Sequence, residues 1–454
     1  MTPQRKRPMI LGAFFHPTGH HVAAWLHPGS QADAPVNFEH YVGLAQTAEQ
    51  AKFDLIFLAD ESAVRKGRME ALSRWPQYMA YFEPLTLLSA IAAVTRNIGL
   101  VATSTTSYNE PYSLARRYAS LDHISHGRAG WNVVTSGNAS ESKNFGREEH
   151  YEHAERYARA REFVQVVKGL WDSWDDDAFM RDRASAQYFD PAKLHILDHR
   201  GPHFSVRGPL NIARPPQGYP VLVQAGASDT GRSFAAETAE IVFTLAQTKE
   251  QAKTFYDDLK GRMAEFGRSP DQLKVLPGLN PIVGRSRTEA QEKYEMLQSL
   301  IHPDVGLEVL SIAFGGYDFR GLPLDELVPD IPMNKNASQG HQINALKMAR
   351  ENSLTIRQLY QRYAGARGNR TIVGTAADIA DQMEDWFSDK AVDGFLIQPP
   401  YLPEGLRDFV SLVVPELRRR GLTREEYSGT TLRENLGLTR PRSRYADPTP
   451  AYAV

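Results

Sequence analysis

Eight short apolar runs alternate with segments of helical spacing, and this alternation constrains the fold of the chain more than any other feature. The runs cover residues 9–15, 53–59, 98–103, 128–135, 221–225, 240–245, 274–283 and 392–398. Continuous apolar runs are typical of parallel strands buried on both faces, and parallel strands need crossover helices between them. The sequence therefore predicts an α/β fold, and a closed (β/α)8 TIM barrel fits the eight strands.

A doubly wound open sheet is the competing layout, but its G-x-G-x-x-G fingerprint does not follow the first apolar run. Two stretches rich in charged, Pro and Gly residues interrupt the alternation, at about 172–220 and 302–370. We interpret both as insertions into one domain that covers residues 1–454. From Gly429 onward the chain is polar and rich in proline, which predicts an extended tail lying on the surface or bound to a partner.

The balance of charges and the absence of cysteine exclude several classes of function. The chain has 52 Lys and Arg against 54 Asp and Glu, without a long run of one sign, so a general nucleic-acid or membrane-surface role has no electrostatic support. No stretch approaches the ~20 uninterrupted apolar residues of a membrane span. Without cysteine there are no disulfides and no thiolate metal sites. We expect a cytoplasmic protein.

Polar residues at the ends of the predicted strands are the candidates for a ligand site, because barrels bind ligands at the carboxyl ends of their strands. These residues include His16, His20, His21, Asp60, Thr103, Asn132, Gln224, Ser228 and Gln398. The set is rich in hydroxyls and amides and poor in convergent carboxylates, which favours a polar cofactor over a metal. The histidines are loosely spaced and no Cys or Asp completes a ligand set, so we expect no metal site.

Two helix starts could bind an anion. His153 and Tyr157 are four residues apart and project from one side of a predicted helix. Near the next helix start, Gly226 allows close backbone approach and Ser228 adds a hydroxyl beside free N–H groups, as a phosphate requires. Without a ligand the same residues would be a polar helix face and an N-cap, and the residues alone do not decide between the two readings.

Several motifs together resemble one family. They lie at residues 53–60, 108–112, 119–123, 144–147, 207–210, 223–226 and 354–360, and the most specific is Gly127-Arg128-Ala129-Gly130-Trp131-Asn132-Val133-Val134-Thr135-Ser136. The chain resembles the bacterial-luciferase-like flavin monooxygenases, in particular the group of nitrilotriacetate monooxygenase component A and dibenzothiophene-sulfone monooxygenase. The resemblance implies a TIM barrel that receives reduced FMN from a separate NAD(P)H:flavin reductase. With O2 as cosubstrate, it would insert one oxygen atom into a small organic substrate and break a C–N or C–S bond.

The resemblance also implies roles for individual residues. Carried over by position, the cofactor-binding residues are Asp60, Thr103, Asn132, His153, Tyr157 and Ser228. The loop residues His20 and His21 are the candidates for handling the peroxide proton, because imidazole titrates near neutral pH. Insertion 302–370, with His302 and His341, is expected to act as a lid.

The sequence constrains the substrate, the oligomeric state and the alternative functions less closely. Arg65, Lys66 and Arg68 follow the second strand and would meet an acidic amine or thioether, or else form a solvated loop. Such barrels commonly pair, so we expect a homodimer or homotetramer. A deazaflavin-dependent oxidoreductase on the same barrel, which transfers hydride without O2, is the alternative enzyme. A flavin-binding protein without turnover is the alternative outside enzymes.

Overall fold

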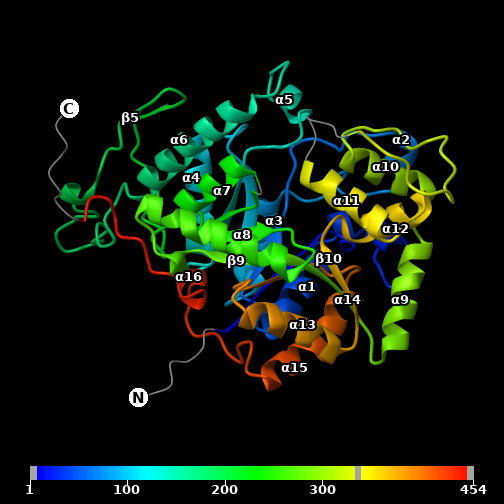
Figure 1. The fold of residues 1–454 in the computed structure, drawn as a ribbon. Coiled ribbons are helices and arrows are strands. Elements are labelled where there is room, and N and C mark those ends of the chain that lie inside the picture. Colours follow the sequence, from blue (N-terminus) through cyan, green and yellow to red (C-terminus); the bar gives the residue numbers. More distant parts are fainter. Residues whose placement is uncertain (1–7, 227, 333–338, 447–454) are drawn as a thin grey trace.

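A closed barrel of eight parallel strands forms the centre of the molecule (Figure 1). The computed structural model describes residues 8–226, 228–332 and 339–446. In barrel order the strands are β1 (Ile10–Phe14), β2 (Leu55–Leu58), β3 (Gly99–Thr105), β4 (Ala129–Val134), β7 (Val221–Gln224), β8 (Ile241–Thr244), β9 (Lys274–Val283) and β11 (Gly394–Ile397). The barrel closes where β11 pairs with β1, so the predicted (β/α)8 fold is confirmed, and each predicted apolar run overlaps one strand.

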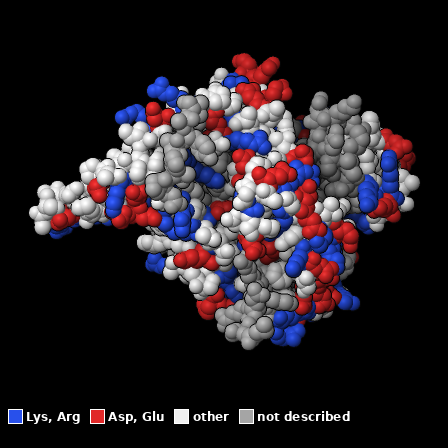
Figure 2. Space-filling view, turned by 60° about the vertical axis from the view of Figure 1, so that its left-hand side comes forward, with Lys and Arg blue, Asp and Glu red and all other residues white. Residues whose placement is uncertain are grey.

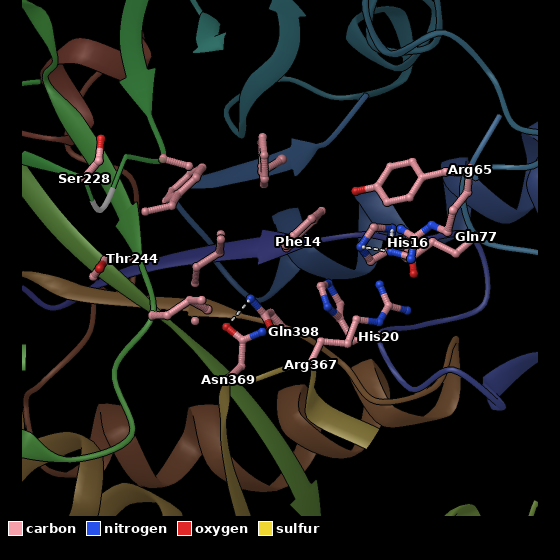
Figure 3. A pocket seen from close by; sticks show the side chains of 17 residues that line it. Phe14, His16, His20, Arg65, Gln77, Ser228, Thr244, Arg367, Asn369 and Gln398 are labelled. Atoms are coloured by element: carbon pink, nitrogen blue, oxygen red, sulfur yellow. Dashed lines mark hydrogen bonds between the residues drawn. The ribbon is translucent and has the colours of Figure 1, made fainter. Parts of the chain in front are cut away.

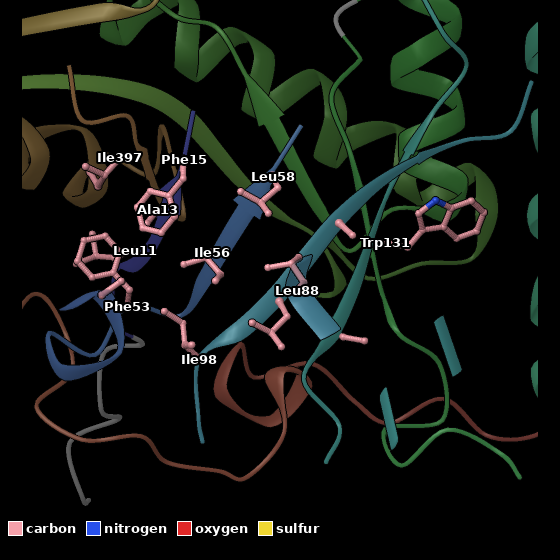
Figure 4. Close-up of a cluster of buried hydrophobic side chains, with 14 of the residues drawn as sticks. Leu11, Ala13, Phe15, Phe53, Ile56, Leu58, Leu88, Ile98, Trp131 and Ile397 are labelled. Carbon is pink, nitrogen blue, oxygen red and sulfur yellow. The ribbon is translucent and has the colours of Figure 1, made fainter. Parts of the chain in front are cut away.

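Alternate residues of each strand serve two separate apolar cores, as the two-residue period of a strand requires. Leu11, Ile56 and Trp131 face outward and pack under the surrounding helices (Figure 4). Leu55 and Val101 instead belong to a cluster at the centre of the barrel. The strands are therefore buried on both sides, which explains their continuous apolar sequences.

Helices cover the outside of the barrel, and several of them begin at a side chain that caps the first turn. The helices are α1 (Phe38–Gln50), α3 (Pro84–Val94), α4 (Pro111–Ile124), α6 (His153–Trp171), α7 (Asp229–Thr238), α8 (Lys249–Arg262), α9 (Arg287–Ser299), α13 (Ala376–Ser388), α14 (Glu404–Asp408) and α15 (Val414–Arg419), with the short α2 (Met69–Leu72) and α5 (Glu141–Asn144). Asn37, Ser228 and Thr248 each accept a backbone N–H from the first turn of the helix that follows. None of the described helices is both long and apolar enough to cross a bilayer.

The second insertion is more regular than its Gly-rich and Pro-rich sequence suggests. It contains α10 (Pro303–Ala313), α11 (Gln339–Glu351) and α12 (Ile356–Ala366), which share a separate apolar cluster with Trp75. The ninth strand, β10 (Arg370–Gly374), then pairs with the second half of β9 outside the barrel. Neither β10 nor α13 was predicted. In contrast, most of the first insertion is irregular, apart from the hairpin of β5 (His199–Arg200) and β6 (Ser205–Val206).

The tail after Gly429 does not simply lie on the surface. It forms α16 (Leu432–Asn435), and Leu432 is fully buried among residues of the barrel centre. A Cβ on Gly99 would lie only 2.4 Å from a methyl carbon of Leu432, so glycine makes room for the leucine. The buried Arg433 pairs with Glu240 at the start of β8. The prediction of a surface-lying tail is wrong for residues 432–438, because their leucines close the amino-terminal end of the barrel.

Candidate active site

A cavity of about 550 Å3 opens among the carboxyl ends of the barrel strands (Figure 3). Its central wall is aromatic, with Phe14, Phe57 and Phe243 in successive contact at ring-centroid distances of 4.5 and 4.7 Å. Its polar lining residues are His16, His20, Arg65, Gln77, Tyr78, Ser228, Thr244, Arg367, Asn369 and Gln398. Gly278 makes room for two of these polar groups, because a Cβ there would lie 2.3 Å from the side-chain amides of Asn369 and Gln398.

The loop after β1 carries the histidines and is fixed against the loop after β11. The backbone N–H groups of His20 and His21 donate to the carbonyls of Pro399 and Pro400, both at 2.9 Å. Gly19 adopts a φ of 119°, and a Cβ there would lie 2.5 Å from the Cα of Tyr401. Only glycine allows this approach of the two loops, so the backbone position of His20 is set by the fold.

The two loop histidines face different surroundings. His20 lines the cavity, where its ring contacts Phe14 and His16 at centroid distances of 4.4 Å. His21 points instead toward α12, since a Cβ on Gly365 would lie 3.2 Å from its Nε2 atom. Burial, with repulsion from Arg367, lowers the pKa of His20 well below its ordinary value and that of His21 to about 3. Both rings are therefore neutral at neutral pH, contrary to the titration near neutrality expected from the sequence.

A second cavity, of about 320 Å3, adjoins the first at Ala225 and lies between α6 and the start of α7. His153 and Tyr157 both line it, as their spacing predicted, and so does Arg156. The guanidinium of Arg156 donates to the carbonyl of Ser136, which holds the charge beside the cavity. A basic side chain, a phenol and a helix amino terminus are together suited to an anion.

Ser228 connects the two cavities. It lines the first one, and its Oγ accepts the backbone N–H of Gly231 at 3.1 Å as the N-cap of α7. A Cβ on Gly231 would lie 3.0 Å from both this Oγ and the hydroxyl of Tyr157. The two hydroxyls therefore converge beside Gly231, which itself lines the second cavity, so both lie near the space that a phosphate group could occupy.

Asp60, Thr103 and Asn132 do not line either cavity. The Thr103 hydroxyl donates to the carbonyl of Leu58 at 2.9 Å and accepts the Asn132 amide at 2.9 Å, so these side chains link three neighbouring strands. The Asp60 carboxylate accepts the hydroxyl of Tyr81 at 3.0 Å, and burial raises the pKa of Asp60 to about 6. Of the eight residues selected from the sequence, the structure brings His20, His153, Tyr157 and Ser228 to the two cavities.

The three basic residues of the loop after β2 lie in different surroundings. Arg65 lines the first cavity, while Lys66 is exposed and Arg68 pairs with Glu308 at 3.0 Å. In the second insertion, His302 caps α10 through the N–H of Asp304. The side chain of His341 lies outside the described residues.

Several polar lining residues were missed, among them Arg156, Arg367 and Asn369. Arg156 carried a detectable signal, because it lies between His153 and Tyr157 at the same helix start. Arg367 and Asn369 carried none, because they come from the end of the second insertion and reach the cavity only through the packing of α12 and β10.

The chain is similar to known proteins over most of its length. Residues 14–393 match the luciferase-like monooxygenase family. The chain is 49% identical to nitrilotriacetate monooxygenase component A of Aminobacter aminovorans and 48% identical to N-acetyl-S-(2-succino)cysteine monooxygenase of Bacillus subtilis (strain 168), in both cases over 97% of this chain and 99% of the relative. The solved structure of EDTA monooxygenase from Chelativorans sp. BNC1 superposes with a TM-score of 0.81 at 32% identity, covering 96% of this chain and 99% of that one.

Proposed function

The chain belongs to the luciferase-like monooxygenase family, and on this premise we propose that it is the oxygenase component of a two-component system. In this proposal a separate NAD(P)H:flavin reductase supplies reduced FMN, and the chain inserts one oxygen atom of O2 into a small organic substrate. Hydroxylation of a carbon beside nitrogen or sulfur gives a product that splits at the C–N or C–S bond. The names of the relatives, which include amine and thioether compounds, support this choice.

The observation that carries the proposal is the pair of adjoining cavities, whose chemistry matches the two ends of FMN. The smaller cavity, lined by Arg156, Tyr157 and Gly231, is suited to a phosphate. The larger one has an aromatic wall and amide groups, and is suited to a planar ring with polar edges. A single molecule would span both through the contact at Ala225, with Ser228 between them.

When bound, reduced FMN supplies the electrons with which O2 transfers one oxygen atom to the substrate and releases the other as water. The side chains of the chain bind the cofactor and the substrate, orient them toward each other and exclude water from the reacting centre. The Nε2 atom of His20 is buried and has no hydrogen-bond partner among the described residues. Because its ring is neutral, we propose that this atom accepts and returns a proton at the reacting centre. His21 supports the loop.

The test of the proposal is to mix the purified chain anaerobically with reduced FMN and then with oxygen, and to follow the spectrum of oxidised FMN. A monooxygenase delays reoxidation relative to free FMN. With NADH, a generic flavin reductase and a panel of sulfur and nitrogen compounds, it also forms an oxygenated product. Immediate reoxidation without product would indicate a flavin-binding protein, and hydride transfer to substrate without O2 would indicate the deazaflavin alternative.

A comparison of His20→Gln with His21→Gln tests the assignment of the proton-handling group. We expect His20→Gln to lower the rate of product formation by roughly 100-fold, as is typical for loss of a general acid–base group, while FMN still binds. His21→Gln should keep most of the rate, since that ring faces α12 and not the cavity. Equal rates for the two variants, measured as product formed at saturating reductase, would remove His20 from the mechanism.

A further inference from the structure

Two guanidinium groups face the larger cavity at the end away from Ser228. Arg65 follows β2, and Arg367 is the residue after α12. Figure 3 shows both beside His16 and His20, with Ser228 and Thr244 at the opposite end. Their charges are therefore separated from the cavity that is suited to the phosphate.

Neither guanidinium has an anionic partner in the part of the chain that the structure describes. Within the described chain, no ion pair or side-chain hydrogen bond joins Arg65 or Arg367 to another residue, and the Nε atom of Arg367 is buried without a partner. Glu61 attracts Arg65 electrostatically but does not form an ion pair with it. Arg68 provides the contrast, because it pairs directly with Glu308. Both side chains are only partly exposed, and an unpaired charge that is partly removed from water is unfavourable for folding, so its presence needs another explanation.

Both guanidinium groups lie against the ring of Trp75. The Cζ atom of Arg65 lies 4.0 Å from the ring centroid of the buried Trp75, and that of Arg367 lies 5.6 Å from the same ring. Tyr78 contacts Arg65 as well, at 5.0 Å. Burial and repulsion from Arg65 lower the pKa of Arg367 to about 9. The described lining of the cavity contains no Asp or Glu, although the whole chain has nearly equal numbers of acidic and basic residues.

We propose that Arg65 and Arg367 form a clamp for a substrate that carries at least two carboxylates beside the nitrogen or sulfur at which oxygen is inserted. This inference rests on the proposed function and names the substrate class of the same site. A guanidinium matches a carboxylate with two parallel N–H···O bonds, and Trp75 holds the groups in place before the substrate arrives. Two carboxylates would neutralise the two charges, which no described residue does.

Binding of small dicarboxylates tests the clamp directly. The probes are 2,2′-thiodiacetate, iminodiacetate and nitrilotriacetate, each beside its methyl ester, titrated calorimetrically into the chain reconstituted with oxidised FMN. We expect the acids to bind and the esters to bind roughly 10- to 100-fold more weakly, the range for losing charge-assisted hydrogen bonds. If none of the acids binds, or if acids and esters bind equally, the clamp is wrong.

Variants of Arg65 and Arg367 test whether these residues bind the substrate, and they separate an effect on binding from an effect on stability. Arg367→Gln and Arg65→Gln should each raise Kd and KM for the acids roughly 10- to 100-fold, with little change in kcat or in FMN affinity. Arg65→Lys keeps the charge but not the planar fork, so it should fall between wild type and Arg65→Gln. Lys66→Gln, an exposed neighbour, is the matched control and should bind like wild type. Because each Gln variant removes an unpaired, half-buried charge, Tm should stay the same or rise.

The outcomes distinguish the clamp from the proposed function. A lower Tm with unchanged affinity for the acids would make the arginines structural and overturn the inference. Weaker FMN binding with unchanged affinity for the acids would assign them to the cofactor, and would overturn it too. Oxygenation of neutral sulfur compounds alone would leave the proposed function standing without the clamp. Failure of the wild-type chain to bind FMN would instead refute the proposed function.

Discussion

Replacing Tyr157 by Phe and Ser228 by Ala in one chain is expected to weaken FMN binding by about 100- to 1000-fold, because two hydroxyls beside the proposed phosphate are lost together. Both hydroxyls lie 3.0 Å from the point where a side chain on Gly231 would begin, so they lie close together beside the smaller cavity. The phenylalanine keeps the ring contact with Phe234 and therefore preserves packing. Fluorescence quenching of FMN on titration with protein measures the affinity.

A cap variant elsewhere controls for the structural part of this change. Ser228→Ala also removes the N-cap of α7, which alone lowers stability by about 1 kcal/mol. Thr248 caps α8 in the same way and lies away from both cavities, so Thr248→Ala should lower stability similarly and leave FMN affinity unchanged. If the double variant binds FMN as tightly as the Thr248→Ala control, the phosphate lies elsewhere and the proposed cofactor site is misplaced.

The barrel could be predicted because each of its strands is buried on both faces, which leaves an unbroken apolar run such as residues 53–59. β10 could not be predicted in that way. It lies outside the closed barrel, pairs with β9 alone and has several half-buried residues in the run Arg370–Gly374. The tail was misjudged for a related reason, because a few leucines among polar residues give no periodic signal until the barrel end they fill is known.

Some of the residues that line the cavities could also be predicted from the sequence, and others could not. His153 and Tyr157 could be paired from sequence, since four residues on a helix fix their relative direction. Whether His20 or His21 faces the cavity could not be decided, because it depends on a loop shaped by Gly19 and the segment after β11. The position of Arg367 in the cavity could be predicted even less. This residue approaches Arg65 only after some three hundred residues of chain have folded between them.

The most specific motif, residues 127–136, is mainly structural. Arg128 is 1% exposed and its guanidinium donates to the carbonyls of Ser125, Ala92, Thr95 and Ile98, at 2.7 to 3.1 Å, and to the Thr95 hydroxyl. Trp131 packs beneath the helices, and its indole donates to the carbonyl of Ser104. Arg128 and Trp131 thus hold the strands in place without lining either cavity, whereas the last four residues of the motif, 133–136, line the smaller one.

Arg128→Met is accordingly expected to lower the free energy of unfolding by about 3–5 kcal/mol, because it leaves several buried carbonyls without a donor. The exposed Arg96 lies near the same turn, and Arg96→Met should change stability by no more than about 0.5 kcal/mol. Urea unfolding followed by tryptophan fluorescence measures both. The folded fraction of Arg128→Met should bind FMN with nearly wild-type affinity, since Arg128 lines neither cavity. A stable variant that loses FMN would reverse this assignment and make Arg128 part of the cofactor site.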